Sequence, residues 1–124
     1  MSRSVSKTPV RLRVGDIGEV QGHLNRLKAP LTVEALTRRL PIRSRAMSGE
    51  GCVFVLVGLR RGVEKPVNQV EAGDMAYMPM RDALNFYYED AATPSPVNLV
   101  GRLEGKLEML KGLPRGTRIS LERR

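Results

Sequence analysis

Apolar and polar residues alternate over several short stretches of the chain, with the period of two typical of strands that bury one face. Near the N-terminus, Val10, Leu12 and Val14 alternate with arginines, which predicts a strand with one basic face. Residues 52–57 are continuously apolar and too few for a typical helix, so a strand buried on both faces is predicted there. The predicted strands cover residues 10–14, 17–24, 42–47, 52–57, 67–70, 75–78, 84–88, 97–103 and 117–122.

Two helices are predicted among these strands. The first covers residues 29–41, with apolar positions at helical spacing, Thr32 as its N-cap and Pro41 as its stop. The second covers residues 104–111, with Gly112 at the position after its end.

The strands are short and joined by turns rather than by helical crossovers. This pattern favours an antiparallel barrel or sandwich over a parallel α/β sheet. A length of 124 residues is typical of a single domain. Residues 1–7 are polar and are predicted to form a loose end.

The charge of the chain is strongly positive, at +8, and arginine supplies 16 of the 21 basic residues. A nucleic-acid surface, Arg-rich codon usage and the ion pairs of a thermophile protein all produce such a balance. The arginines fall in different predicted elements instead of one block, which favours a generally basic solvated surface. A nucleic-acid partner is therefore the less favoured interpretation.

Several classes of protein are disfavoured by what the sequence lacks. One cysteine, Cys52, and one histidine, His23, are too few for a Cys/His zinc cage or an internal disulfide, and we predict no metal. No Walker loop, GxGxxG motif or nucleophile elbow is present, so no cofactor is predicted. No apolar run is long enough for a membrane span, and the first residues do not match a secretory signal. We therefore expect a cytoplasmic protein with no membrane partner.

Residues 73–105 hold four of the five aromatic residues, three of the six methionines and three of the eight prolines. Such clustering marks either the densest part of the core or the wall of a pocket. Within it, Asn85 and Tyr87 share one face of a predicted strand, because side chains two positions apart point the same way. Phe86 and Tyr88 are predicted to point into the barrel.

Three blocks of the sequence, in this order and spacing, resemble the small cyclophilin-like family of bacterial and archaeal proteins of unassigned function. They are APLTVEALTRRLPIRSRA at 29–46, VEAGDMAYMPMRDALNFYY at 70–88 and VNLVGRLEGKLEMLKGLPRGTRISLER at 97–123. The resemblance implies a mainly β, cyclophilin-like barrel of about eight mostly antiparallel strands with two α-helices. It also implies a shallow pocket on the outside of the barrel.

The resemblance suggests which residues line that pocket. The strand after the first helix carries the catalytic arginine in cyclophilins, and here it offers two candidates without fixing which one faces the pocket. The segment Asn85-Phe86-Tyr87 is similar to the pocket strand of cyclophilins, and methionines fall nearby. The candidate ligand-binding residues are Arg43, Arg45, Tyr77, Met78, Met80, Asn85 and Tyr87.

Two departures from the cyclophilin pattern weaken an enzymatic interpretation. Val97 stands where cyclophilins carry a histidine, and the chain contains no tryptophan to close the pocket. We therefore predict binding of a small anionic ligand or a peptide, with no catalytic residue assigned. A weak peptidyl-prolyl cis-trans isomerase and a basic nucleic-acid-binding barrel stay as alternatives. The free face of the Tyr87 strand suits either a ligand or a partner subunit, so a homodimer also stays open.

Overall fold

The computed structural model describes residues 6–124, and over this range the chain is mainly β, as the alternation predicts. Residues 1–5 of the predicted loose end lie outside the described residues, and Lys7 already belongs to the first strand. In chain order the elements are β1 (Lys7–Val14), β2 (Gly18–Asn25), α1 (Pro30–Arg39), β3 (Ile42–Arg45), β4 (Met47–Gly49), β5 (Cys52–Leu56), β6 (Val67–Val70), β7 (Asp74–Met78), β8 (Ala83–Tyr87), β9 (Ala91–Glu104), the 3-10 helix η1 (Leu107–Leu110) and β10 (Arg118–Arg123).

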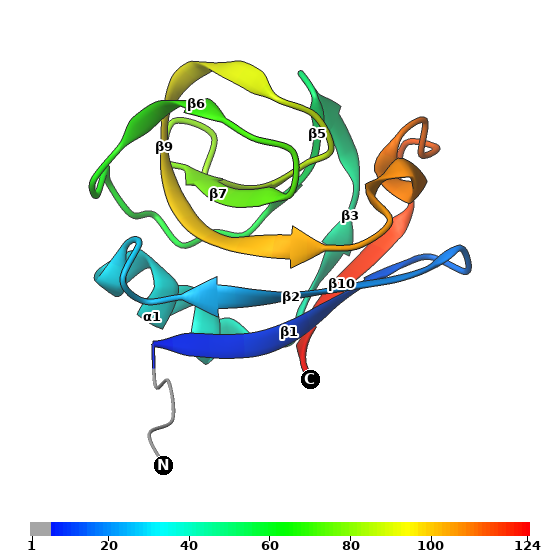
Figure 1. Ribbon diagram of the computed structural model, residues 1–124, viewed down its shortest axis with the longest axis horizontal. Helices are drawn as coiled ribbons and strands as arrows, with labels where there is room; N and C mark the ends of the chain where they lie inside the picture. The colour runs from blue at the N-terminus through cyan, green and yellow to red at the C-terminus, as the bar shows by residue number, and fades with distance from the viewer. Residues whose placement is uncertain (1–5) are drawn as a thin grey trace.

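The strands form one strongly curved sheet in the order β3-β10-β1-β2-β9-β7-β8-β5-β4, with β6 paired to β9 (Figure 1). Every pairing is antiparallel. The hydrogen-bonded path has two ends, β3 and β4, so the predicted barrel is not confirmed. These two ends are consecutive along the chain and are separated only by Ala46. The first pairs with β10 and the second with β5, and no ladder joins the two ends.

A main core fills the concave side of this sheet. Alternate residues of β1, such as Leu12, contribute to it, and so do Leu84 and Phe86 from one face of β8. The other faces of β7 and β8 are buried too, under a second, smaller core. The members of this second core are Cys52, Val70, Ala76, Met78, Tyr87 and Val97. Five consecutive buried residues in each of β7 and β8 follow from this double coverage.

The long strand β9 corrects one prediction. Residues 89–96, which contain two prolines, lie between the predicted strands 84–88 and 97–103, but β9 begins at Ala91 and runs for 14 residues. Its first part pairs with β6, with an irregular register between Val67 and Gln69, and its later part pairs with β7 and β2 (Figure 1). Pro94 and Pro96 are tolerated because a sheet edge and an irregular register do not require every backbone N–H. This part of the chain lies over the second core.

The first helix ends as expected but starts differently. Its N-cap is Ala29, which provides no side-chain hydrogen bond, so the predicted Thr32 cap is wrong. The carboxylate of Glu64, from the loop before β6, takes that role. It accepts hydrogen bonds from the backbone N–H groups of Leu31 and Thr32 at 3.0 and 2.9 Å. These are donors that the first turn of a helix leaves free.

The second predicted helix, over residues 104–111, is not an α-helix. Glu104 still belongs to β9, and only the four residues of η1 are helical, in 3-10 geometry. Gly105, with a φ of 123°, separates the strand from this turn. A left-handed residue at that point prevents the helix from starting at Glu104.

Candidate functional site

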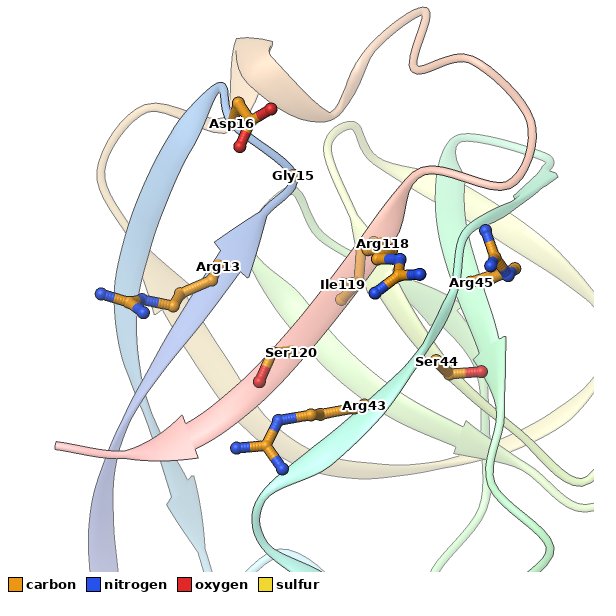
Figure 2. A pocket seen from close by; sticks show the side chains of 9 residues that line it. All are labelled: Arg13, Gly15, Asp16, Arg43, Ser44, Arg45, Arg118, Ile119 and Ser120. Carbon is orange, nitrogen blue, oxygen red and sulfur yellow. The ribbon is translucent and has the colours of Figure 1, made fainter.

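Arginines gather on the outer face of three neighbouring strands, β1, β10 and β3, around a hollow of about 580 Å³ (Figure 2). We call this hollow the arginine groove. Its lining residues are Arg13, Gly15, Asp16, Arg43, Ser44, Arg45, Arg118, Ile119 and Ser120.

The pleat of the strands places these arginines on one face. In β10, Ile119 and Leu121 point into the main core, so Arg118 and Ser120 point outward. The register then sets Arg118 directly opposite Arg45, and Ser120 opposite Arg43. Across the other edge of β10, Ser120 lies opposite Arg13. Figure 2 shows the side chains of Arg45 and Arg118 on neighbouring strands, with Asp16 on the turn that follows β1.

The groove holds more positive charge than the protein neutralises. Arg13 lies 3.9 Å from carboxylate oxygens of Glu19 and of Glu122. Arg45 donates one hydrogen bond to the carbonyl of Gly116 at 3.2 Å. Among residues 6–124, no ion pair joins a carboxylate to Arg43, Arg45 or Arg118. Like charges placed directly opposite each other on paired strands repel, so the pair Arg45–Arg118 is unfavourable unless an anion lies between the two.

Three of the predicted pocket residues, Met78, Asn85 and Tyr87, line a different and smaller cavity of about 240 Å³. We call it the Asn85 cavity. Its lining residues are Ser48, Gly49, Glu50, Cys52, Met78, Arg81, Asn85, Tyr87 and Pro94. The two candidate arginines, Arg43 and Arg45, do not line it. The sequence had suggested one joint site, and the structure separates its members between two.

Arg81 supplies the cation of the Asn85 cavity and was not among the predicted pocket residues. It lies in the turn between β7 and β8, with its guanidinium carbon 4.2 Å from the centre of the Phe54 ring. The available signal was its place between two strands of the aromatic-rich stretch. A turn residue between paired strands stays close to both strands. The position of Arg43 relative to this stretch instead depends on the order of the strands in the whole sheet, in which β3 lies at the end opposite to β8 and β5.

The remaining two candidates line neither cavity. Met80 lies on the same turn and is 83% exposed. Tyr77 is fully buried, donates its hydroxyl proton to Asp82 at 2.6 Å, and accepts a hydrogen bond from the backbone N–H of Arg61 at 3.1 Å. Burial and the hydrogen bond to Asp82 raise the pKa of Tyr77 to about 12. Tyr77 thus holds the loop after β5 against the turn after β7.

Cys52 and Tyr87 stay protonated at neutral pH in the Asn85 cavity. Burial raises the pKa of the Cys52 thiol to about 11, although the charge of Arg81 acts in the opposite direction. Burial likewise raises the pKa of Tyr87, against the hydrogen bond from Asn85. The cavity therefore presents neutral hydrogen-bonding groups at its floor and no nucleophilic thiolate.

The position at which the resemblance places the histidine of cyclophilins holds an apolar residue, Val97. Val97 is fully buried in the second core, with Tyr87 and Met78.

In the described part of the chain, no group of His, Cys, Asp and Glu side chains could hold a metal ion. Within the same range, none of the helices has the length and apolar character needed to cross a membrane.

Comparison with known proteins places this geometry in context. A family model described as cyclophilin-like matches residues 8–122. The fold is similar to the solution structure of the hypothetical protein AF2241 from Archaeoglobus fulgidus, with a TM-score of 0.74, 25% sequence identity and full coverage of both chains. No match was found among curated proteins.

Proposed function

Since the chain belongs to the cyclophilin-like family, we propose that it uses this scaffold to bind a small anionic ligand, or a peptide carrying an anionic group, in the arginine groove. The observation that carries the proposal is the cross-strand pair of Arg45 and Arg118 without a carboxylate partner. An anion between the two guanidinium groups turns a repulsive contact into two attractive ones.

The side chains suit phosphate and carboxylate groups. A guanidinium offers a planar fork of donors that matches two oxygens of either group. Arg43 and Arg45 are exposed, so a ligand in solution can reach both guanidinium groups. Asp16 is the one acidic side chain that lines the groove. The excess of positive charge favours a ligand with at least two negative charges.

Binding of inorganic pyrophosphate, followed by isothermal titration calorimetry at low salt, tests the proposal. We expect saturable binding that weakens at least ~100-fold in the double variant Arg45→Gln/Arg118→Gln, because two charge-assisted pairs are lost and each is worth about 1.5–3 kcal/mol. Arg26→Gln/Lys28→Gln is the matched control, since it also removes two positive charges, from exposed residues outside the groove. Its affinity should stay within about twofold of the wild type if the exposed charge acts only at long range.

Two results contradict the proposal. One is the absence of saturable binding to the wild type. The other is an equal loss of affinity in Arg26→Gln/Lys28→Gln and in Arg45→Gln/Arg118→Gln, which means that only net charge matters. A single-stranded oligonucleotide that binds more tightly than pyrophosphate, with an affinity that falls steeply with salt, supports the nucleic-acid alternative instead.

A further inference from the structure

The floor of the Asn85 cavity has an unusual composition for a protein interior. Leu84 and Phe86 occupy the main-core face of β8, while Asn85 and Tyr87 occupy the opposite face, next to the second core. Asn85 is fully buried, and Tyr87 is 2% exposed. Apolar residues at both positions would continue the second core, because its other members are almost all apolar.

The hydrogen bonding of Asn85 is incomplete. Its Nδ2 donates to the hydroxyl oxygen of Tyr87 at 2.9 Å, and its Oδ1 is buried without a partner in the described residues. If the amide is reversed, the Tyr87 hydroxyl donates to Oδ1, and Nδ2 is then the atom without a partner. Either orientation leaves one amide atom of Asn85 unpaired beside the cavity. An unpaired buried amide group is unfavourable by about 1–3 kcal/mol, so native proteins pair nearly all of them.

The mouth of the cavity carries opposite charges. Arg81 is half-buried, and Glu50 is exposed. No ion pair between these two is recorded among residues 6–124. Gly49 lies beside them, and a Cβ added to it would stand 3.6 Å from Nη1 of Arg81 and 2.7 Å from Sγ of Cys52. Glycine is therefore required at this position by close packing against the buried thiol of Cys52, and it leaves Nη1 of Arg81 uncovered on that side.

We propose that the Asn85 cavity is a second binding site, distinct from the arginine groove, for a small molecule that carries an amide group next to a carboxylate. The amide of such a ligand offers one donor and one acceptor, which match the unpaired atom of Asn85 and the hydroxyl of Tyr87 in either orientation of the Asn85 side chain. Its carboxylate pairs with the guanidinium of Arg81 at the mouth.

The size of the cavity supports this class of ligand. A volume of about 240 Å³ equals that of roughly eight water molecules at ~30 Å³ each. N-acetylglycine, with about eight non-hydrogen atoms, has both required groups and is a simple probe of the class. The thioether of Met78 and the ring of Pro94 provide apolar contacts for its methyl and methylene groups.

The binding test is a titration of the ¹⁵N-labelled full chain followed by NMR, with N-acetylglycine, acetamide and acetate as separate probes. We expect N-acetylglycine to shift the side-chain amide signals of Asn85 and the backbone signals of Cys52 and Tyr87, with a dissociation constant of about 1 mM or tighter. Acetamide and acetate each lack one of the two groups and should bind at least ~10-fold more weakly, which corresponds to about 1.4 kcal/mol. If acetate shifts the same signals at the same concentrations, the cavity does not bind the amide group of N-acetylglycine, and the proposal is wrong.

Two variants separate a binding role from a structural one. Arg81→Gln removes the guanidinium that pairs with the carboxylate and should weaken N-acetylglycine binding at least ~10-fold, whereas Arg26→Gln is the matched control, because it removes the same charge from an exposed residue outside both cavities. The double variant Asn85→Leu/Tyr87→Phe replaces the polar pair with apolar groups of similar shape. It should lose N-acetylglycine binding while its thermal midpoint stays equal to that of the wild type or rises.

Opposite results overturn the inference. A large fall in the thermal midpoint of the double variant shows that the Asn85–Tyr87 pair serves stability. Unchanged N-acetylglycine affinity in the double variant, or in Arg81→Gln, shows that the probe binds elsewhere. Because Arg81, Asn85 and Tyr87 do not line the arginine groove, pyrophosphate affinity in both variants should stay within about twofold of the wild type, so the two proposed sites can fail independently.

Discussion

The carboxylate of Glu64 provides the sharpest test of how the loop before β6 is held against α1. It accepts a hydrogen bond from the Thr32 hydroxyl at 2.7 Å, in addition to the two backbone hydrogen bonds from the first turn of α1. Glu64 is itself held in place, because its backbone N–H donates to Oδ1 of Asn98 at 2.7 Å. The side chain thus fastens the loop before β6 to the start of the helix.

We expect Glu64→Ala to lower the free energy of unfolding by about 3 kcal/mol, from three hydrogen bonds at about 1 kcal/mol each. For a chain of this length, a loss of that size lowers the thermal midpoint by roughly 10 °C. The measurement is urea denaturation followed by circular dichroism. The slope of the unfolding free energy against urea concentration should not change, because the surface exposed on unfolding is the same.

Glu34→Ala is the matched control on the same helix. Glu34 pairs with Arg38 at 2.6 Å on the exposed surface, and such pairs contribute about 0.3–0.5 kcal/mol. Glu64→Gln keeps one acceptor oxygen and should fall between the two alanine variants. If Glu64→Ala is no more destabilising than Glu34→Ala, Glu64 does not cap the helix in solution, and the position of the loop before β6 is wrong.

Further predictions concern pH, reactivity, charge and catalysis. Desolvation by burial acts to raise the pKa of Glu64, but the hydrogen bonds from Leu31 and Thr32 and the charge of Lys65 outweigh it and lower that pKa below its ordinary value of 4.5. The contribution of the Glu64 carboxylate to the free energy of unfolding is therefore full above pH 4.5 and is lost as the pH falls through the lowered pKa. Glu64→Gln should accordingly reduce the loss of stability at acid pH. Cys52 should react with iodoacetamide at pH 8 about 100-fold more slowly than in the urea-unfolded chain, because its pKa of about 11 leaves only about 0.1% thiolate, against about 10% at the ordinary pKa of 9.0; comparable rates would show that the thiol is not buried. Arg118→Gln should raise the unfolding free energy by about 0.5 kcal/mol at low salt and have no effect in ~1 M salt, where screening acts within about 3 Å; a loss of stability at low salt would contradict the repulsion between Arg45 and Arg118. An X–Pro peptide assay should show little isomerisation above the uncatalysed rate, because Val97 is apolar and buried; activity comparable to that of ordinary cyclophilins would contradict this prediction.

The alternation of residues was enough to predict the faces of individual strands. Leu12 lies in the main core, as its place in the pattern indicates, and Arg13 is exposed. The prediction that Asn85 and Tyr87 share a face opposite to Phe86 is also confirmed. These predictions succeed because the pleat is a local property of the backbone, with a period set by covalent geometry.

The errors arose where distant contacts override local pattern. Pro94 and Pro96 lie outside the predicted strands, because proline disfavours a strand, but pairing with β6 and packing on the second core stabilise that segment as part of β9. Thr32 has the right chemistry for a helix cap, but Glu64, far along the chain, accepts from the same free N–H groups. The second helix shortened to one 3-10 turn because the strand before it continues to Glu104.

The sequence by itself determined the mainly β class, the family resemblance and the side of each strand on which its arginines lie. Only the tertiary structure decided which arginine meets which cavity. The order of strands in the sheet places Arg45 opposite Arg118 and leaves Arg81, not Arg43 or Arg45, beside Asn85. Which strands become neighbours in the sheet depends on how the whole chain packs its two cores. No local pattern in the sequence records that order, so it could not be inferred from the sequence.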